Sequence, residues 1–276
     1  MEIVRVFVLA LDALDYELVK KWRLKNLLQR RYGTFEVGRE YFYREEPYSP
    51  IIWTSVITGR KPEEHGIRAW WLYGGILERI RWWPIIRHIK GKRRILWRLG
   101  LKAHVPNRGD LRCETIFDVV KPSVAVYVPG YNESTEFHER LFKVSGWNVD
   151  RYIREAWRIH EERKRATLRA LEENRNWKLF MAYFDLADHV GHTYIKRNRL
   201  RVLRAYLELN SLAGRLQELV PPGTIFLIIS DHGMRAVEDD VAGRHTTYAF
   251  WSLNLDTDWE PRDFTDFYPK ILEWTR

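Results

Sequence analysis

The sequence predicts an α/β fold with a mostly parallel central sheet between layers of helices. Short apolar runs rich in β-branched and aromatic residues occur at 3–11, 124–128, 179–184 and 225–229. Two long helical patterns, at 152–173 and 200–219, alternate with the later runs. Strand–helix alternation of this kind is typical of a parallel sheet covered by helices on both faces.

The first elements follow from the N-terminal pattern. The run at 3–11 predicts a buried parallel strand, and residues 15–31 predict an amphipathic helix after it. Residues 51–58 predict a short helix that stops at Gly59, with Pro62 just beyond it. The apolar part of the first run is too short for a signal peptide and has no small-residue cleavage site, so a first strand explains it better.

The length fits one large domain over residues 1–276, or one domain with a sizeable insertion. No stretch reaches the roughly 20 apolar residues of a membrane-spanning helix, so the expected location is cytoplasmic. The single cysteine, Cys113, cannot form an intrachain disulfide, and we expect a plain buried thiol there. The net charge of +9 favours anionic partners.

The positive charge is concentrated in one segment. Residues 68–108 contain eleven Lys or Arg and one acidic residue, Glu78, which is a net charge of +10, together with five Trp residues. We expect 68–112 to form a basic, Trp-rich cap inserted into the domain. A solvated basic helical face held by its Trp residues is the ordinary explanation. An anionic membrane surface, which would make the protein membrane-peripheral, is a sharper hypothesis, and a nucleic-acid surface is a weaker one.

Six Asp and His residues are candidate metal ligands. In chain order they are Asp12, Asp188, His192, Asp231, His232 and His245. These residues fall into four short pieces of sequence: Asp12, the Asp188–His192 pair, the Asp231–His232 pair and His245. Three of the four pieces follow apolar strands, and open α/β sheets bind their ligands beyond the carboxyl ends of the strands. Asp-x-x-x-His spacing places two side chains on one side of a helical turn. Each piece is weak alone, but together they predict two divalent metal ions with open coordination positions. Carboxylate and imidazole donors suit zinc first, with manganese or iron as alternatives.

Two segments carry a family resemblance. The sequence is IISDHGM at 228–234 and TGRKPEEHGI at 58–67. These segments resemble the alkaline phosphatase superfamily and, within it, the type I phosphodiesterase/nucleotide pyrophosphatase branch. The resemblance implies an alkaline phosphatase-like core and a metal-dependent hydrolase of phosphoric esters, with a small phosphate ester as substrate.

The same resemblance implies a nucleophile. In the family a Thr or Ser lies nine residues before the Thr of Thr-Gly, and here that residue is Ser49, with Thr54 as a reserve. The start of a helix favours negative charge, so an alkoxide and a phosphate are both stabilised there. The alternative is that Ser49 only caps the helix, with Pro50 at its first position.

The resemblance also divides the ligands between the two metals. Asp12, Asp231 and His232 would hold the metal that activates Ser49. The remaining three, Asp188, His192 and His245, would hold the metal that activates water for the second step. Two metals about 4 Å apart can stabilise both the attacking and the leaving oxygen.

The chain departs from the family where a phosphoryl oxygen is held. The Asn that nucleotide pyrophosphatases use falls on Trp70 here, and Pro50 has no backbone N–H to offer. Arg68 is our candidate substrate-binding replacement. A phosphomonoesterase or phosphonate hydrolase on the same site stays open, as does a non-catalytic protein that binds anionic lipid or nucleic acid.

Several neighbouring residues are not predicted as ligands. His65 is expected to brace its loop through a hydrogen bond. His189 should point away from the ligand pair, and Asp185 has the wrong spacing to His192. Surface or cap positions are expected for the other histidines, His88, His104, His138 and His160.

Overall fold

The computed structural model describes residues 4–73, 103–145, 148–238, 240 and 242–276. Its main sheet has six strands in the order β2-β10-β7-β1-β6-β5. Their bounds are β1 Val6–Leu11, β2 Arg31–Glu36, β5 Ser123–Val126, β6 Leu179–Phe184, β7 Ile225–Ser230 and β10 Tyr248–Leu253. The four strands β7, β1, β6 and β5 are parallel, and β10 and β2 add an antiparallel edge. The predicted mostly parallel sheet is confirmed.

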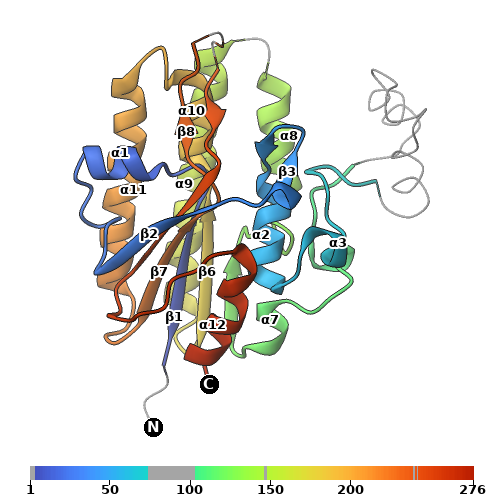
Figure 1. The fold of residues 1–276 in the computed structure, drawn as a ribbon, viewed down its shortest axis with the longest axis vertical. Helices are drawn as coiled ribbons and strands as arrows, with labels where there is room; N and C mark the ends of the chain where they lie inside the picture. Colours follow the sequence, from blue (N-terminus) through green and yellow to red (C-terminus); the bar gives the residue numbers. More distant parts are fainter. Residues whose placement is uncertain (1–3, 74–102, 146–147, 239, 241) are drawn as a thin grey trace.

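The central strand β1 pairs with parallel neighbours on both sides. Its last residue, Leu11, lies opposite Phe184 of β6, and Ala10 lies opposite Ile229 of β7. The three strands therefore end at one level. Figure 1 shows this edge at the end of the molecule opposite both chain termini, with α10 and β8 above it.

Helices cover both faces of the sheet (Figure 1). One face packs against α1 (Tyr16–Lys21), α9 (Val149–Glu173), α10 (Leu186–Tyr194) and α11 (Arg199–Leu219). The other packs against α2 (Ser49–Thr58), α7 (Ile116–Val119) and α12 (Phe267–Trp274). Alternate residues of β1 enter the two cores, because strand side chains point to opposite faces.

Shorter elements connect these layers: α3 (Pro62–His65), α8 (Thr135–Val144), β3 (Phe42–Tyr43), β4 (Glu46–Pro47), β8 (Met234–Arg235), β9 (Arg244–His245) and 3-10 turns at Arg39–Tyr41, Arg108–Asp110 and Phe264–Asp266. The pairs β3–β4 and β8–β9 are small antiparallel ribbons. The second ribbon places β9 beside the segment that leaves β7.

The prediction of a helix over 15–31 is wrong beyond the first turns. Asp15 accepts a hydrogen bond from the backbone N–H of Leu18 and caps α1, but the helix ends at Lys21. Arg23 then adopts a φ of +52°, a left-handed conformation that stops a helix and is uncommon for a residue other than glycine. The chain leaves the helix layer there and returns as β2, an edge strand that the sequence pattern did not reveal.

Other predicted elements agree closely with the structure. The strand at 179–184 matches β6, and the helices at 152–173 and 200–219 match α9 and α11. The helix α2 ends before Gly59, whose φ of +63° is left-handed. A Cβ atom at Gly59 would also come within 2.9 Å of Tyr268, so both the turn and the packing require glycine.

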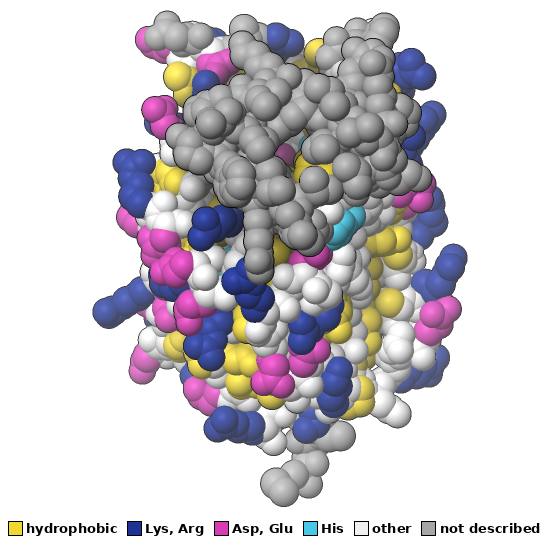
Figure 2. Space-filling view, turned by 90° about the vertical axis from the view of Figure 1, so that its right-hand side faces the viewer, with side chains coloured by type: hydrophobic (Ala, Val, Ile, Leu, Met, Phe, Trp, Pro, Cys, Tyr) yellow, Lys and Arg dark blue, Asp and Glu magenta, His cyan; other side chains and the backbone are white. Residues whose placement is uncertain are grey.

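The predicted cap lies largely outside the described residues, since 74–102 are not among them. Its two described ends meet in a β-bridge, where Leu72 and His104 exchange backbone hydrogen bonds of 2.8 and 2.9 Å. On the face shown in Figure 2, the Lys and Arg side chains of the described residues are mixed with Asp and Glu. The role of 68–108 as an anionic surface contact stays a prediction.

Two smaller predictions need correction. Cys113 is half-buried rather than buried. His160 is neither on the surface nor in the cap: it is fully buried and contacts the rings of Trp157 and Phe184. Among the described residues, no helix is both long enough and apolar enough to cross a bilayer.

A buried ion-pair network joins α9 to the carboxyl edge of the sheet. Arg163 is fully buried and donates to both carboxylate oxygens of Glu133, at 2.9 and 2.8 Å, and to Asp185 at 2.9 Å. Its guanidinium holds the pKa of Asp185 well below the ordinary value, even though burial alone would raise it. The network fixes the residue that follows β6 and begins α10.

We expect Arg163→Met to lower the free energy of unfolding by about 3 to 5 kcal/mol, because the change removes the guanidinium shared by the buried Glu133 and Asp185 and leaves only histidines beside them. Urea unfolding followed by circular dichroism measures this. The matched control is Arg169→Met on the same helix, where the side chain is exposed and the change should stay within about 0.5 kcal/mol. Equal effects of the two variants would contradict a stabilising role for the network.

Candidate active site

The six predicted metal ligands meet at the carboxyl edge of the sheet. Asp12 follows β1, and Asp231 and His232 follow β7. The helix α10, which comes directly after β6, carries Asp188 and His192 one turn apart. The ribbon of β8 and β9 brings in His245, which pairs with Met234.

Three of the ligands surround the hydroxyl of Ser49. His232 Nε2 lies 3.5 Å from Asp12 Oδ1 and 3.3 Å from Asp231 Oδ2. Ser49 Oγ donates to Asp12 Oδ1 at 3.3 Å and lies 3.3 Å from His232 Nε2. All four side chains are buried, and the ligand atoms of Asp12, Asp231 and His232 are close enough to share one metal ion.

The other three ligands form a second group. Asp188 Oδ1 lies 3.2 Å from His192 Nε2 and 3.4 Å from His245 Nε2, and the two imidazole nitrogens are 2.8 Å apart. His232 also comes within ligand distance of Asp188 and His245, and its ring stacks on that of His245 with centroids 3.7 Å apart. The two groups therefore adjoin at His232.

Each of the three imidazoles is held by its Nδ1 atom. A backbone carbonyl lies near Nδ1 in each case: Gly243 for His192 at 2.8 Å, Pro47 for His245 at 2.9 Å and Gly233 for His232 at 3.1 Å. A carbonyl only accepts, so Nδ1 carries the proton and donates. In the neutral ring, Nε2 then keeps a free lone pair, which is the arrangement found in metal-binding histidines.

The electrostatics differ between the two groups. Despite burial, His192 and His245 hold the pKa of Asp188 well below its ordinary value, and Asp188 raises the pKa of His192 to about 9. In the group beside Ser49 the charged forms are disfavoured. Burial raises the pKa of Asp12 well above its ordinary value, and the negative charges of Asp231 and Asp188 raise it further. Burial likewise raises the pKa of Asp231 to about 7 and lowers that of His232 well below its ordinary value. None of the described Lys or Arg side chains forms an ion pair with these carboxylates. A bound cation would supply the missing positive charge.

Two buried carboxylate oxygens fit this interpretation. Asp231 Oδ2 and Asp188 Oδ1 have no hydrogen-bond partner among the described residues, and one lies in each group. Buried polar atoms are rarely left without a partner, and a coordinating ion is one explanation of such an exception. The donor set of carboxylates and imidazoles fits a divalent metal in both groups.

Supporting residues that the sequence did not reveal hold these ligands in place. Tyr183 of β6 donates to Asp12 Oδ2 at 2.5 Å. Ser230 Oγ accepts from Leu14 N and donates to the His232 carbonyl. Tyr183 and Ser230 become evident only when the strands lie side by side in the fold, because a Tyr or Ser in a buried strand has no distinctive spacing in the sequence.

Gly233 allows the turn after the Asp-His pair to pack tightly. A Cβ atom there would lie 2.2 Å from Asp15 Oδ2 and 2.8 Å from Thr246 Oγ1. The Gly233 N–H donates to Thr246 Oγ1, and the Gly233 carbonyl accepts from Thr246 N. This pair of bonds aligns the segment before β10 with the end of β7.

The remaining candidates are placed as follows. Ser49 is the first helical residue of α2 and Tyr48 precedes it as the cap, so Ser49 is not the cap itself. Thr54 lies one turn further along, where its hydroxyl donates to the Pro50 carbonyl at 2.7 Å. Arg68 is exposed and has no hydrogen bond or ion pair to the described residues of the site, so its substrate role stays a prediction.

The residues not predicted as ligands have other partners. Asp185 pairs with Arg163, and His189 contacts Asp185 at 3.5 Å and Tyr152 at 2.9 Å. A third group of metal-binding type consists of His160, Glu161 and Glu208. Lys164 Nζ already lies 2.6 Å from a carboxylate oxygen of each glutamate, so this group contains its own cation.

His65 braces the loop between α3 and the start of the predicted cap. Its Nδ1 accepts from the Ile67 N–H at 3.1 Å, and its Nε2 lies 3.1 Å from Ser55 Oγ. The ring is fully buried, and this burial lowers the pKa of His65 to about 4. Protonation of Nδ1 would break the bond to Ile67. The predicted structural role is confirmed.

A comparison with known proteins finds a family model that matches most of this chain. The family model described as type I phosphodiesterase / nucleotide pyrophosphatase matches residues 6–270. A search of the curated proteins finds no match.

Solved structures of similar fold include an inactive form of murine ectonucleotide pyrophosphatase/phosphodiesterase 5 in complex with AMP. It has 15% identity and a TM-score of 0.47, and the match covers 86% of this chain and 59% of that one. Phosphonoacetate hydrolase from Sinorhizobium meliloti 1021, in complex with phosphonoformate, has 16% identity and a TM-score of 0.48, with 84% and 57% covered. The chain thus spans less than two thirds of the length of these proteins.

The low pKa of His65 predicts a pH-dependent contribution to stability. An unfolded His has a pKa near 6.5, so the unfolded chain takes up a proton first as the pH falls. The contribution is present above about pH 6.5 and is lost toward pH 4, on the order of 3 kcal/mol in total.

We therefore expect His65→Gln to be less stable than the wild type near neutral pH and to lose less stability on acidification. Urea unfolding near pH 7 and near pH 4.5 gives the comparison. The control is His104→Gln, a half-exposed histidine that pairs with Asp110. A stability difference between wild type and His65→Gln that does not change with pH would rule out this assignment.

Proposed function

This chain belongs to the type I phosphodiesterase/nucleotide pyrophosphatase family, whose model matches residues 6–270, and from this premise we propose that it is a metal-dependent phosphodiesterase with Ser49 as nucleophile. Phosphomonoesters and phosphonates are the alternative substrates of the same site. The metal ligands proposed are the six residues at the carboxyl edge, Asp12, Asp188, His192, Asp231, His232 and His245.

One observation carries this proposal. Three imidazoles converge with the buried carboxylates of Asp12 and Asp231 and the half-buried carboxylate of Asp188. Each imidazole has its Nδ1 hydrogen-bonded to a backbone carbonyl. A purely structural cluster would leave Asp12 and Asp231 buried side by side, next to a His232 whose burial disfavours the positive charge that would balance them. The ligand set instead fits two divalent metal ions, and zinc is our first candidate for their identity.

We propose the division of ligands between the two ions that the family resemblance implies, with His232 also close to Asp188 and His245. Asp12, Asp231 and His232 would hold one ion beside Ser49, and Asp188, His192 and His245 would hold the other. When bound, such ions lower the pKa of a coordinated hydroxyl or water and stabilise charge on the phosphoryl oxygens.

The surroundings of Ser49 support its proposed role as the nucleophile. Its Oγ is within 3.3 Å of both Asp12 and His232, and its place in the first turn of α2 puts it at the positive end of the helix dipole. In the first step Ser49 Oγ would form a bond to phosphorus while the bond to the leaving alcohol oxygen breaks. Water would then cleave the Ser49 phosphoester and restore the hydroxyl.

We expect Ser49→Ala to lower kcat for bis-p-nitrophenyl phosphate by at least about a thousandfold, because the covalent route is lost. The metal content should stay that of the wild type. Assays of p-nitrophenyl phosphate and a phosphonate ester alongside establish which ester class is preferred. Full activity in Ser49→Ala would reject this nucleophile, and Thr54→Ala would then be tested.

Elemental analysis of the purified full chain should find two divalent metal ions per molecule. We expect Asp188→Asn to retain about one ion, because metal ligands lost from one group leave the other intact. Glu208→Gln is the matched control, since the carboxylate of Glu208 already pairs with Lys164. Wild-type protein without bound metal, or Asp188→Asn with two ions, would contradict the two-metal site.

A further inference from the structure

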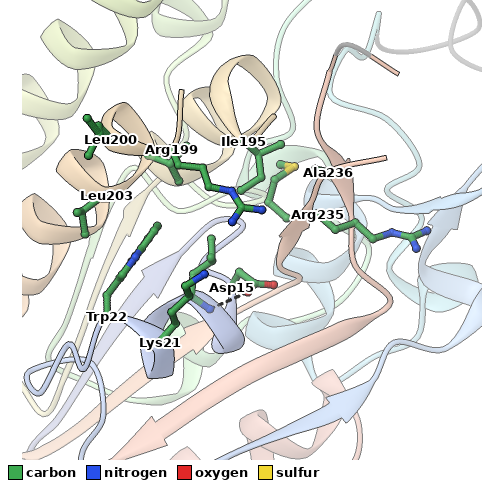
Figure 3. A pocket seen from close by; sticks show the side chains of 12 residues that line it. Asp15, Lys21, Trp22, Ile195, Arg199, Leu200, Leu203, Arg235 and Ala236 are labelled. Carbon is green, nitrogen blue, oxygen red and sulfur yellow. Dashed lines mark hydrogen bonds between the residues drawn. The ribbon is translucent and has the colours of Figure 1, made fainter. Parts of the chain in front are cut away.

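A separate cavity of about 230 Å³ lies between α1, the start of α11 and β8 (Figure 3). Its lining comes from Asp15, Leu18, Lys21 and Trp22 on one side, Ile195, Arg199, Leu200, Val202 and Leu203 on another, and Met234, Arg235 and Ala236 on the third. None of the six proposed metal ligands belongs to this lining.

The cavity is nevertheless adjacent to the ligand segments in sequence. Its three walls begin at Asp15, Ile195 and Met234, which lie two or three residues after Asp12, His192 and His232. Met234 also packs tightly on α10, since a Cβ atom at Gly191 would come within 2.8 Å of its Cγ. An occupant would therefore contact segments that also carry the proposed metal ligands.

The inner surface of the cavity is apolar. Val202 and Met234 are almost fully buried, and Leu18, Trp22 and Leu203 are half-buried beside them. Most ligand pockets combine such an apolar lining with a few polar groups that fix the orientation of the ligand. The volume suits a short hydrocarbon chain better than a nucleotide.

The polar groups that remain available at this cavity are cationic. Lys21 and Arg199 have no ion pair or hydrogen bond from their side chains to any described residue, and Figure 3 shows Arg199 extending over the cavity. Asp15 is already occupied, because it accepts from the Leu18 N–H and from the Tyr248 hydroxyl. Arg235 lies at the rim, and its guanidinium points away in Figure 3.

We propose that this cavity binds a small amphipathic anion, with its apolar chain against Leu18, Trp22 and Met234 and its anionic head on Arg199 and Lys21. The head would be a carboxylate, sulfonate or phosphate, since both cations pair with any of these. This site is distinct from the proposed site of phosphoester hydrolysis.

Isothermal titration calorimetry with octanesulfonate on the full-length, metal-containing protein tests the proposal, because a sulfonate is neither an ester substrate nor a strong metal ligand. We expect octanesulfonate to bind at least about tenfold more tightly than either octanol or inorganic sulfate, since octanol lacks the anionic head and sulfate lacks the apolar chain. Arg199→Gln should weaken binding about tenfold, the effect of removing one charge-assisted hydrogen bond.

Two further variants make the test specific. Ala236→Phe narrows the mouth of the cavity at an exposed position and should abolish binding. Arg235→Gln removes the same charge from a side chain that points away from the cavity. The affinity of this variant for octanesulfonate should stay within about twofold of wild type.

Binding that survives Ala236→Phe, equal losses in Arg199→Gln and Arg235→Gln, or equal affinity for octanol would each overturn the proposal. If Ala236→Phe fails to fold by circular dichroism, the comparison of Arg199→Gln with Arg235→Gln decides alone. None of these measurements uses ester turnover, so a failure of the proposed hydrolase function leaves this test unaffected.

Discussion

The register in which β1 pairs with its two parallel neighbours determines where the chemistry of this protein lies. Leu11 and Phe184 are direct partners, and Ala10 faces Ile229, so the chain leaves all three strands at one level. Asp12, α10 and the Asp231-His232 pair therefore emerge side by side. A shift of one residue in either pairing would turn every strand side chain to the opposite face and separate the ligands, and the two buried cores prevent that shift.

Two groups of carboxylates, all buried except the half-buried Asp188, lie at this edge in different electrostatic surroundings. Glu133 and Asp185 receive a fully buried guanidinium from Arg163, so a cation within the protein balances their charge. Asp12, Asp188 and Asp231 have no Lys or Arg partner in the described part of the chain, and the only side chains near them that can carry a positive charge are histidines. Burying charge without a partner is costly, so the contrast indicates that the second group is built for an external cation. This electrostatic difference connects the architecture to the proposed hydrolysis of phosphoric esters.

The central elements were predictable because their patterns are local. Continuous apolar runs specify strands buried on both faces, and long amphipathic patterns specify α9 and α11. The antiparallel edge strand β2 was not predictable in the same way. In β2, half-exposed and exposed residues alternate, and a Cβ atom at Gly33 would lie 3.1 Å from the ring of Trp251, a contact that the sequence pattern does not reveal. The early end of α1 depends on a left-handed arginine, Arg23, which has none of the composition of a helix stop.

The sequence by itself determined the chemical types and the order of the site residues. Strand ends and motif spacing predicted six residues as metal ligands, and all six lie within the span 6–270 of the family match: Asp12, Asp188, His192, Asp231, His232 and His245. Only the tertiary structure decided which atoms meet. It placed His232 between the two groups, set the carbonyls that hold each imidazole, and brought Tyr183 to Asp12. The physical reason is that such contacts join residues far apart in the chain, and strand register and helix packing fix them while local pattern does not.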